Sequence, residues 1–202
     1  MNNPNNIHPV FDRIMGRAHK EKLLNQCSKV IWFTGLSGAG KTTVALHLER
    51  ALYDRGYLTQ ILDGDNIRSG INNNLGFTEA DRLENIRRIA EVSKLLVDSG
   101  VITLNSFISP TNEIREMAKK IIGKENFIEV FVNTPIEVCE QRDVKGLYEK
   151  ARKGKIKNFT GIDSPFDAPE NPDIELLTHK HSLEESVQQC LDVILSKIEY
   201  KG

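Results

Sequence analysis

The sequence GLSGAGKT at residues 35–42 fits the pattern G-x-x-x-x-G-K-[S/T] at every fixed position. The apolar run VIWF at residues 30–33 leads into it, and residues 43–55 follow, with Val44, Leu48 and Leu52 spaced for one buried helix face. A glycine-rich turn before an ordinary helix is the alternative, which these strand-like and helix-like flanks disfavour. We therefore predict a strand, a phosphate-binding loop and a helix in succession.

This loop predicts a site for ATP and Mg²⁺. Its glycines let successive backbone N–H groups point at phosphate oxygens, and the N-terminus of the following helix adds the positive end of its dipole. In such loops the lysine, here Lys41, reaches the β- and γ-phosphates, and the hydroxyl, here that of Thr42, binds Mg²⁺. The residues predicted to bind ATP are Gly35, Leu36, Ser37, Gly38, Ala39, Gly40, Lys41, Thr42, Thr43 and Arg142.

Short apolar runs alternate with longer helical patterns along the chain. Strands are predicted at residues 30–34, 58–62, 101–107 and 127–132, and they lack strict alternation, which is typical of parallel strands covered on both faces. The sequence thus predicts an α/β fold, the three-layer P-loop nucleoside triphosphate hydrolase-like fold, with a parallel sheet flanked by helices and a basic lid. We expect residues 29–202 to form this domain, with the lid at about residues 142–165. Residues 1–28 are expected to form a partly flexible N-terminal extension.

Helix start signals support the alternation. The candidate capping boxes are Thr78 with Asp81, Thr134 with Glu137, and Ser182 with Glu185. Pro135 would then occupy the first helical position, where its missing N–H costs nothing. The last helix is predicted to dock on the core through one apolar face made of Val187, Leu191, Ile194, Leu195 and Ile198.

Carboxylates follow the second predicted strand, in LDGDNIR at residues 62–68. The carboxyl ends of parallel strands border the ligand crevice of such folds. A kinase needs a carboxylate there to accept the proton of the attacking hydroxyl, and another to organise Mg²⁺. We assign the first role to Asp65, and metal binding or support to Asp63 together with Thr42. A turn with solvated carboxylates is the alternative.

An aromatic and several polar residues come next. In the predicted helix after residue 78, Arg82, Asn85 and Ile89 share one face. Phe77 precedes this helix and is suited to stack on a base, while Arg82 and Asn85 are suited to hold an acidic substrate. The alternative is a solvated, charged helix face.

Basic residues concentrate at residues 142–157, where seven lysines and arginines face two acidic residues. A mobile basic lid that closes over phosphates and excludes water explains this concentration. A nucleic-acid surface would need a broader positive area and exposed aromatic residues, of which the sequence offers little. Plain surface charge is the remaining alternative.

Composition narrows the functional classes. The formal net charge is −1, so no global field attracts nucleic acid or an anionic membrane. No apolar run approaches the roughly 18 residues of a membrane helix, and the N-terminal MNNPNNIHPVFDR lacks the pattern of a secretory signal. The cysteines (Cys27, Cys139 and Cys190) are few and far apart, which predicts free thiols rather than disulfides or a zinc site. We expect a cytoplasmic protein.

A phosphate loop is shared by kinases, GTPases and ATPase motors. The N-K-x-D guanine signature of GTPases is absent from the sequence, and the chain is short for a motor domain. A small-molecule kinase remains, acting on a nucleotide or on a nucleoside, shikimate or gluconate. A regulatory nucleotide-binding module that has lost catalysis is the other alternative, although Lys41, Asp63 and Asp65 argue against it.

The motifs taken together resemble those of the adenylylsulfate kinases. The resemblance covers about residues 30–172 and rests on GLSGAGKTT, LDGDNIR, LGF, ENIRR, FISP, VCEQRDVKGLYEKARKG and FTGIDSPFDAPENP, in this order. DVKGLY followed by FTGID is far more specific than the phosphate loop. The resemblance implies that MgATP phosphorylates the 3′-hydroxyl of adenosine 5′-phosphosulfate, giving 3′-phosphoadenosine 5′-phosphosulfate, and that the protein is a cytosolic homodimer.

The resemblance also implies a binding site for the sulfonucleotide. The two aromatic residues would sandwich its adenine, and the arginines would face its phosphosulfate oxygens. The matching residues are Asp65, Arg68, Phe77, Arg82, Asn85, Ile108, Ser109, Lys145 and Phe159.

Three positions qualify the resemblance. The serine matching Ser109 is described in parts of the family as a phosphoenzyme carrier. No nearby base in the sequence activates it, so we favour substrate contact and direct in-line transfer. Lys145, Arg142 and Arg152 would then spread the charge that develops during transfer. Many relatives have a tyrosine where this chain has Thr111, and an acidic residue where it has Leu83. These two differences bear on local loop packing.

Overall fold

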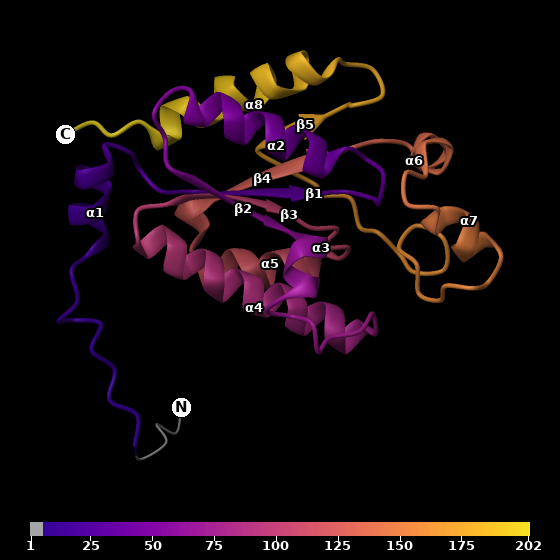
Figure 1. Cartoon of the computed structure of the whole chain (residues 1–202), viewed down its shortest axis with the longest axis horizontal. Coiled ribbons are helices and arrows are strands. Elements are labelled where there is room, and N and C mark those ends of the chain that lie inside the picture. The colour runs from indigo at the N-terminus through magenta and orange to yellow at the C-terminus, as the bar shows by residue number, and fades with distance from the viewer. Residues whose placement is uncertain (1–5) are drawn as a thin grey trace.

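The computed structural model describes residues 6–202 and contains a five-stranded, wholly parallel sheet (Figure 1). The strand order is β2-β3-β1-β4-β5, and every ladder runs parallel. The strands are β1 (Val30–Thr34), β2 (Thr59–Asp63), β3 (Ile102–Ser106), β4 (Phe127–Val132) and β5 (Ile174–Leu176). The chain leaves β1 at the centre, forms β2 at the edge and returns through β3, so the order reverses beside β1, where ligands bind in open α/β sheets.

Helices cover both faces of the sheet. Figure 1 shows α2 and α8 above it and α4 and α5 below it, with α6 and α7 beyond one end. The helices are α1 (Arg17–Leu24), α2 (Lys41–Tyr53), α3 (Gly64–Ser69), α4 (Glu79–Asp98), α5 (Asn112–Ile122), the 3₁₀ turn η1 (Lys124–Asn126), α6 (Ile136–Arg142), α7 (Leu147–Arg152) and α8 (Leu183–Ile198). This confirms the predicted three-layer α/β fold with a flanked parallel sheet.

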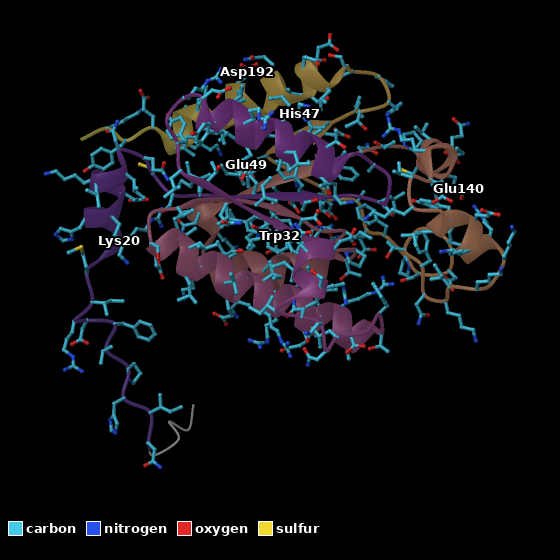
Figure 2. The ribbon with its side chains drawn as sticks, viewed as in Figure 1. Lys20, Trp32, His47, Glu49, Glu140 and Asp192 are labelled. Carbon is cyan, nitrogen blue, oxygen red and sulfur yellow. The ribbon has the colours of Figure 1, made fainter. Side chains whose placement is uncertain are left out.

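The two faces of the sheet bury separate apolar clusters. One joins Leu48 and Leu52 of α2 to Ile194 of α8 across β1 and β4. The other gathers around Trp32, whose ring stacks with Phe107 and lies between the sheet and the α4–α5 layer (Figure 2). Because β1, β3 and β4 are buried on both faces, they read in the sequence as nearly continuous apolar runs.

The predicted elements agree with the structure to within a few residues. The first and fourth strands have the predicted bounds, the second is shifted by one residue, and the third is one residue shorter at each end. The helix after the phosphate loop begins at Lys41 instead of residue 43 and ends at Tyr53. β5 was not predicted because it has only three residues, with the exposed Glu175 at its centre.

Of the three predicted capping boxes, one forms in full, one forms only in part, and one does not form. Ser182 and Glu185 form the full capping box, whereas Thr78 caps α4 by accepting the Asp81 N–H, but its own N–H donates no reciprocal bond to the Asp81 carboxylate. The box of Thr134 with Glu137 does not form, since α6 begins at Ile136 with Pro135 as its cap. The Thr134 hydroxyl donates instead to the Ala39 carbonyl, so a tertiary contact replaces the local one.

The segment before β1 meets the body of the protein through α1. Arg17 donates to the Asn126 side chain and to the Ser28 carbonyl, and the Gln26 amide bonds to the carbonyls of Leu58 and Gly100. The first five residues of the predicted N-terminal extension lie outside the described residues. Among residues 6–202, no helix is long and apolar enough to cross a membrane, and all three cysteines are free thiols, as predicted.

Candidate active site

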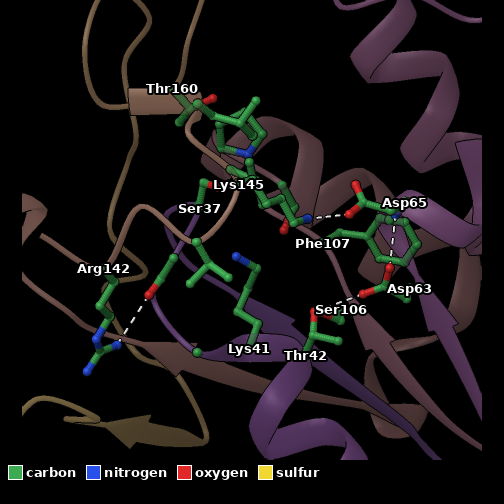
Figure 3. A pocket seen from close by; sticks show the side chains of 18 of the residues that line it. Ser37, Lys41, Thr42, Asp63, Asp65, Ser106, Phe107, Arg142, Lys145 and Thr160 are labelled. Carbon is green, nitrogen blue, oxygen red and sulfur yellow. Dashed lines mark hydrogen bonds and ion pairs between the residues drawn. The ribbon is translucent and has the colours of Figure 1, made fainter. Parts of the chain in front are cut away.

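A cavity of about 850 Å³ opens at the carboxyl ends of β1, β2 and β3 (Figure 3). Its walls come from the phosphate loop, the turn into α3, the N-terminal part of α4, the loop after β3 and residues 142–160. The fold therefore brings these five separate stretches of the sequence to one space beside the point where the strand order reverses.

The phosphate loop takes its shape from glycines that no other residue could replace without strain. Gly35 has φ +142°, and a Cβ there would lie 2.6 Å from the Val132 carbonyl oxygen of β4. Hydroxyls fix the far side of the loop, where Thr178 and Thr134 both donate to the Ala39 carbonyl, at 2.7 Å and 3.1 Å. The loop is thus clamped between β4 and the segment after β5.

Lys41 is the buried cation of the loop. It begins α2, is 8 % exposed, and its Nζ donates to the carbonyl oxygens of Gly35 and Leu36 at 2.9 Å and 2.8 Å. Burial penalises its ammonium form and lowers the pKa of Lys41 from 10.5 to about 8. A cation that is poorly solvated and held only by neutral carbonyls gains strongly from an anionic ligand.

Asp63 joins the phosphate loop to the turn after β2. Its Oδ2 accepts a 2.8 Å hydrogen bond from the Thr42 hydroxyl, and its Oδ1 accepts the Asp65 N–H at 3.0 Å, which caps α3. The Ser106 hydroxyl lies 3.0 Å from that of Thr42. Hydroxyl and carboxylate oxygens thus cluster at the start of α2, and such hard oxygen donors are the ligands that Mg²⁺ prefers.

Asp65 is the second residue of α3 and also lines the cavity. Its carboxylate pairs with the ammonium of Lys145, which reaches across from the segment between α6 and α7 (Figure 3). Both side chains are more than half exposed, so the pair is accessible from the cavity and solvent screens it.

Two arginines and one aromatic ring form the wall opposite the phosphate loop. The guanidinium of Arg68 lies 4.4 Å from the centre of the Phe77 ring and donates to the carbonyls of Leu75 and Gly76. Arg82 donates to the Thr160 hydroxyl at 2.7 Å, to the Phe77 carbonyl at 3.1 Å and to the Asn158 carbonyl. Phe77 itself is 64 % exposed. The two guanidinium groups thus lie beside the exposed Phe77.

The loop after β3 and Phe159 form the floor of the cavity beside this wall. Ser109 adopts the left-handed region at φ +39°, is buried, and its hydroxyl donates to Thr34 while it accepts the Trp32 indole N–H at 3.0 Å. Ile108 and Phe159 line the cavity beside it. Because both partners of the Ser109 hydroxyl are neutral, neither can act as a base to activate it.

Residues 142–160 contact the phosphate loop at two points. Arg142 donates to the carbonyls of Gly38 and Thr178, and the Tyr148 hydroxyl donates to the Ser37 carbonyl at 2.9 Å. Burial raises the pKa of Tyr148, so its hydroxyl keeps the proton that it donates. Tyr148 also packs edge-on against Phe159, with ring centres 4.9 Å apart, which links the loop to the opposite wall.

Most residues predicted for the site line this one cavity; Arg152 and three residues of the phosphate loop do not. Gly35, Leu36 and Ala39 are not in its lining, because the first turns toward β4, the second packs on Gly161 and the third is fully buried. The predicted residues in the lining are Ser37, Gly38, Gly40, Lys41, Thr42, Thr43, Asp63, Asp65, Arg68, Phe77, Arg82, Asn85, Ile108, Ser109, Arg142, Lys145 and Phe159.

The sequence interpretation missed several polar residues of the site. Thr160 lies within FTGID and Tyr148 within DVKGLY. Both motifs are specific to the resemblance, but the sequence assigns no role to these two residues. Thr178 and Ser106 were also missed, because a single hydroxyl gives no sequence signal until the fold shows what it contacts.

Comparison with known proteins finds relatives that match over nearly the whole chain. The family model described as adenylylsulphate kinase matches residues 27–177. The adenylyl-sulfate kinase of Bacteroides thetaiotaomicron is 66% identical over 201 residues, covering 100% of both chains, and that of Clostridium kluyveri is 53% identical over 186 residues, covering 92% of this chain and 93% of the relative. The Mycobacterium tuberculosis APS kinase in complex with AMPPNP and APS superposes with a TM-score of 0.80 at 48% identity, covering 83% of this chain and 98% of that one.

The hydrogen bond from the Tyr148 hydroxyl to the Ser37 carbonyl is predicted to stabilise residues 147–152 locally. Tyr148→Phe leaves the Ser37 carbonyl without this donor, so amides of residues 147–152 should exchange with solvent about fivefold faster, the equivalent of about 1 kcal/mol. Hydrogen–deuterium exchange measures this change, with the central strands as an internal reference. Tyr53→Phe, at an exposed tyrosine, is the matched control. Equal protection of residues 147–152 in wild type and Tyr148→Phe would contradict the contact's importance.

Proposed function

Because this chain belongs to the adenylylsulfate kinase family, we propose that it transfers the γ-phosphate of ATP to the 3′-hydroxyl of adenosine 5′-phosphosulfate. The product is 3′-phosphoadenosine 5′-phosphosulfate, the activated sulfate donor. One observation carries the proposal beyond the family: the phosphate loop, Asp65 and the arginine wall share a single cavity that is large enough for two nucleotides in contact.

ATP is proposed to lie on residues 35–43. In this role the backbone N–H groups and the start of α2 bind the phosphate oxygens, and Lys41 exchanges its two carbonyl partners for the β- and γ-phosphates. The burial of the ammonium supports this role, since the cation is held at the loop and lacks water. Arg142, at the outer end of the loop, is proposed to contact the rest of the nucleotide.

Thr42 and Asp63 are proposed to hold Mg²⁺. Their oxygens lie within 2.8 Å of each other, and among the described residues no cluster of three or more His, Cys, Asp or Glu side chains competes as a metal site. This fits an ion that keeps most of its water and takes only one or two protein ligands beside the phosphates. When bound, Mg²⁺ neutralises charge on the β- and γ-phosphate oxygens.

The sulfonucleotide is proposed to bind the opposite wall. Arg68, Arg82 and Lys145 supply charge for its phosphosulfate oxygens, Asn85 supplies a hydrogen bond, and Ile108, Ser109 and Phe159 line its pocket with Phe77. The exposed ring of Phe77 supports the stacking role, since it has no protein partner over most of its surface apart from Arg68. Charge-assisted bonds of this kind are typically worth about 1.5–3 kcal/mol each.

Asp65 is proposed as the general base. The carboxylate accepts the 3′-hydroxyl proton while that oxygen forms its bond to the γ-phosphorus; the bond from this phosphorus to the bridging oxygen breaks, and ADP leaves. The phosphosulfate would draw Lys145 away from Asp65 and so free the carboxylate for the proton. Lys41, Arg142 and Lys145 then spread the transferred charge. Arg152 is a weaker candidate, since it pairs with Glu140.

Direct transfer is preferred over a phosphorylated Ser109. The Ser109 hydroxyl is buried and bonded to Trp32 and Thr34, so it would have to break both bonds to attack ATP. We propose that it shapes the pocket floor and contacts the substrate. Residues 142–165 are proposed to close as a lid, hinged at Gly146 and Gly154, whose positive φ angles of +61° and +67° suit glycine.

Family membership alone is the basis for two further parts of the proposal. We propose that the chain works as a homodimer and that it is cytoplasmic, as the resemblance implied.

Product analysis tests the function as a whole. Purified protein mixed with MgATP and adenosine 5′-phosphosulfate should release ADP and 3′-phosphoadenosine 5′-phosphosulfate in equal amounts, because one phosphate moves per cycle. Chromatography with mass detection identifies both products. Release of ADP with AMP, a nucleoside, shikimate or gluconate, but not with the sulfonucleotide, would replace this proposal by another small-molecule kinase. No turnover with any acceptor would identify a silent nucleotide-binding module.

Removal of the proposed base should slow the chemical step. Asp65→Ala is expected to lower kcat by about a hundredfold or more, the usual contribution of a positioned general base. Steady-state kinetics at saturating concentrations of both nucleotides measure this loss. Asp98→Ala, at an exposed aspartate outside the cavity lining, is the control and should keep the wild-type kcat. An Asp65→Ala enzyme with full kcat would remove Asp65 from this role.

The lowered pKa of Lys41 predicts a pH-dependent affinity for ATP. Phosphates bind the ammonium form, and the free protein loses that proton as the pH rises through about 8. Affinity for MgATP should therefore have nearly its full value at pH 7, halve by about pH 8, and fall about tenfold in all between pH 7 and pH 9, whereas an exposed lysine would hold its proton to about pH 10. Calorimetric titration across this range measures the change. The Lys41→Met variant should bind weakly with a flat profile, and a flat wild-type profile would contradict the prediction.

A further inference from the structure

Asn72 is a fully buried polar residue behind the substrate wall. It lies in the turn between α3 and α4, where its N–H donates to the Ile67 carbonyl and its own carbonyl accepts the Leu75 N–H. Its side chain makes hydrogen bonds at both ends, to Asn85 and to Arg88, although it does not line the cavity. A buried amide so fully bonded fixes the orientation of its neighbours.

The polarity of these bonds follows from partners whose chemistry allows one choice. Arg88 can only donate, so the atom of Asn72 that faces Arg88 Nη1 at 3.4 Å must be the oxygen Oδ1. The backbone carbonyl of Asn85 can only accept, so the atom facing it at 3.4 Å must be Nδ2 of Asn72. Both ends of the Asn72 amide are therefore assigned independently, and they agree.

This assignment passes to the side chain of Asn85. Nδ2 of Asn72 donates at 3.0 Å to the Asn85 side chain, and only the oxygen Oδ1 can accept that bond. The other end of the Asn85 amide, Nδ2, is then turned away from Asn72. Asn85 lines the cavity, and its Nδ2 makes no hydrogen bond to any of residues 6–202.

Arg88, whose guanidinium fixes the orientation of the Asn72 amide, is itself held by neighbouring side chains. Its Nε lies 2.7 Å from a carboxylate oxygen of Glu84, and its Nη1 donates to Asn74 at 2.9 Å. The arrangement runs in one direction, from Arg88 to Asn72 to Asn85, and each step fixes the next donor.

We propose that Asn72 is a positioning residue that makes Asn85 present an N–H donor, and not a carbonyl acceptor, to the substrate. The inference rests on the proposed function, in which Asn85 contacts adenosine 5′-phosphosulfate. The ligand atom opposite Asn85 is accordingly an acceptor oxygen or ring nitrogen. This suits the surrounding wall, where Arg68 and Arg82 also present only donors.

The donor polarity is tested without any change at Asn72. Asn85→Ala removes the donor and should raise KM for adenosine 5′-phosphosulfate about tenfold, with kcat and KM for ATP within twofold of wild type. Asn85→Asp keeps the shape and the acceptor that Asn72 requires but turns a carboxylate oxygen toward the cavity, so its KM should exceed that of Asn85→Ala. An Asn85→Asp enzyme with a wild-type KM would show that an acceptor serves the substrate, and would overturn the proposal.

The role of Asn72 is tested by a matched pair of variants. Asn72→Leu removes the donor that fixes Asn85 and should raise the same KM about threefold to tenfold, while Asn73→Leu, at the exposed neighbour, should not change it. Asn72→Asp replaces the donor by a second acceptor, which favours the reversed Asn85 amide and should raise KM further. Thermal unfolding and KM for ATP measure any general loss of structure in each variant.

A double-mutant cycle separates positioning from plain destabilisation. If Asn72 acts through Asn85, Asn72→Leu should change KM for adenosine 5′-phosphosulfate less than twofold in the Asn85→Ala background. An equal effect in both backgrounds would overturn the inference, as would an Asn85→Ala enzyme with a wild-type KM. In either case wild-type formation of 3′-phosphoadenosine 5′-phosphosulfate would still stand, so failure here is distinct from failure of the proposed function.

Discussion

The close approach of Gly35 to β4 is the constraint on which the site depends. The chain must leave β1 and turn within van der Waals distance of the Val132 carbonyl, where a Cβ would lie 2.6 Å from that oxygen. Only glycine accepts both this contact and a φ of +142°. The turn sends Lys41 to the start of α2 and its Nζ back over the loop, so the position of one backbone segment sets where a triphosphate can be bound.

Asp63 then ties the second half of the site to the first. One carboxylate oxygen accepts from Thr42 at the start of α2, and the other caps α3, from which Asp65 and Arg68 reach the cavity. The proposed base is therefore held in fixed relation to the phosphate loop through a single side chain. The opposite wall is bound less directly, since Arg82 of α4 bonds to Thr160 and Asn158 in the segment that is proposed to close. Closure and substrate binding would thus share the same residues.

The parts of the molecule that the sequence predicted are those with local or periodic signals. Continuous apolar runs indicated β1 to β4, a fixed spacing of glycines indicated the phosphate loop, and Ser182 with Glu185 indicated the start of α8. The failures had tertiary causes. Thr134 was expected to cap a helix but bonds to the Ala39 carbonyl, and β5 exists only because β4 offers it an edge. Asn72 could not be found from the sequence, because its meaning lies in a contact with Asn85 thirteen residues away.

The cations of the site are held mostly by carbonyl oxygens, and this has a consequence for the chemistry. Lys41, Arg68, Arg82 and Arg142 each donate to backbone carbonyls, whose dipoles fix a cation without cancelling its charge. Carboxylate partners would have neutralised the wall before any substrate arrived. A protein with a formal net charge of −1 can therefore concentrate positive potential in one cavity. Lys145 is the exception, since it pairs with Asp65. Under the proposed mechanism this pairing would keep the proposed base ionised among so many cations, and an arriving anion would compete for Lys145 when the carboxylate must be free.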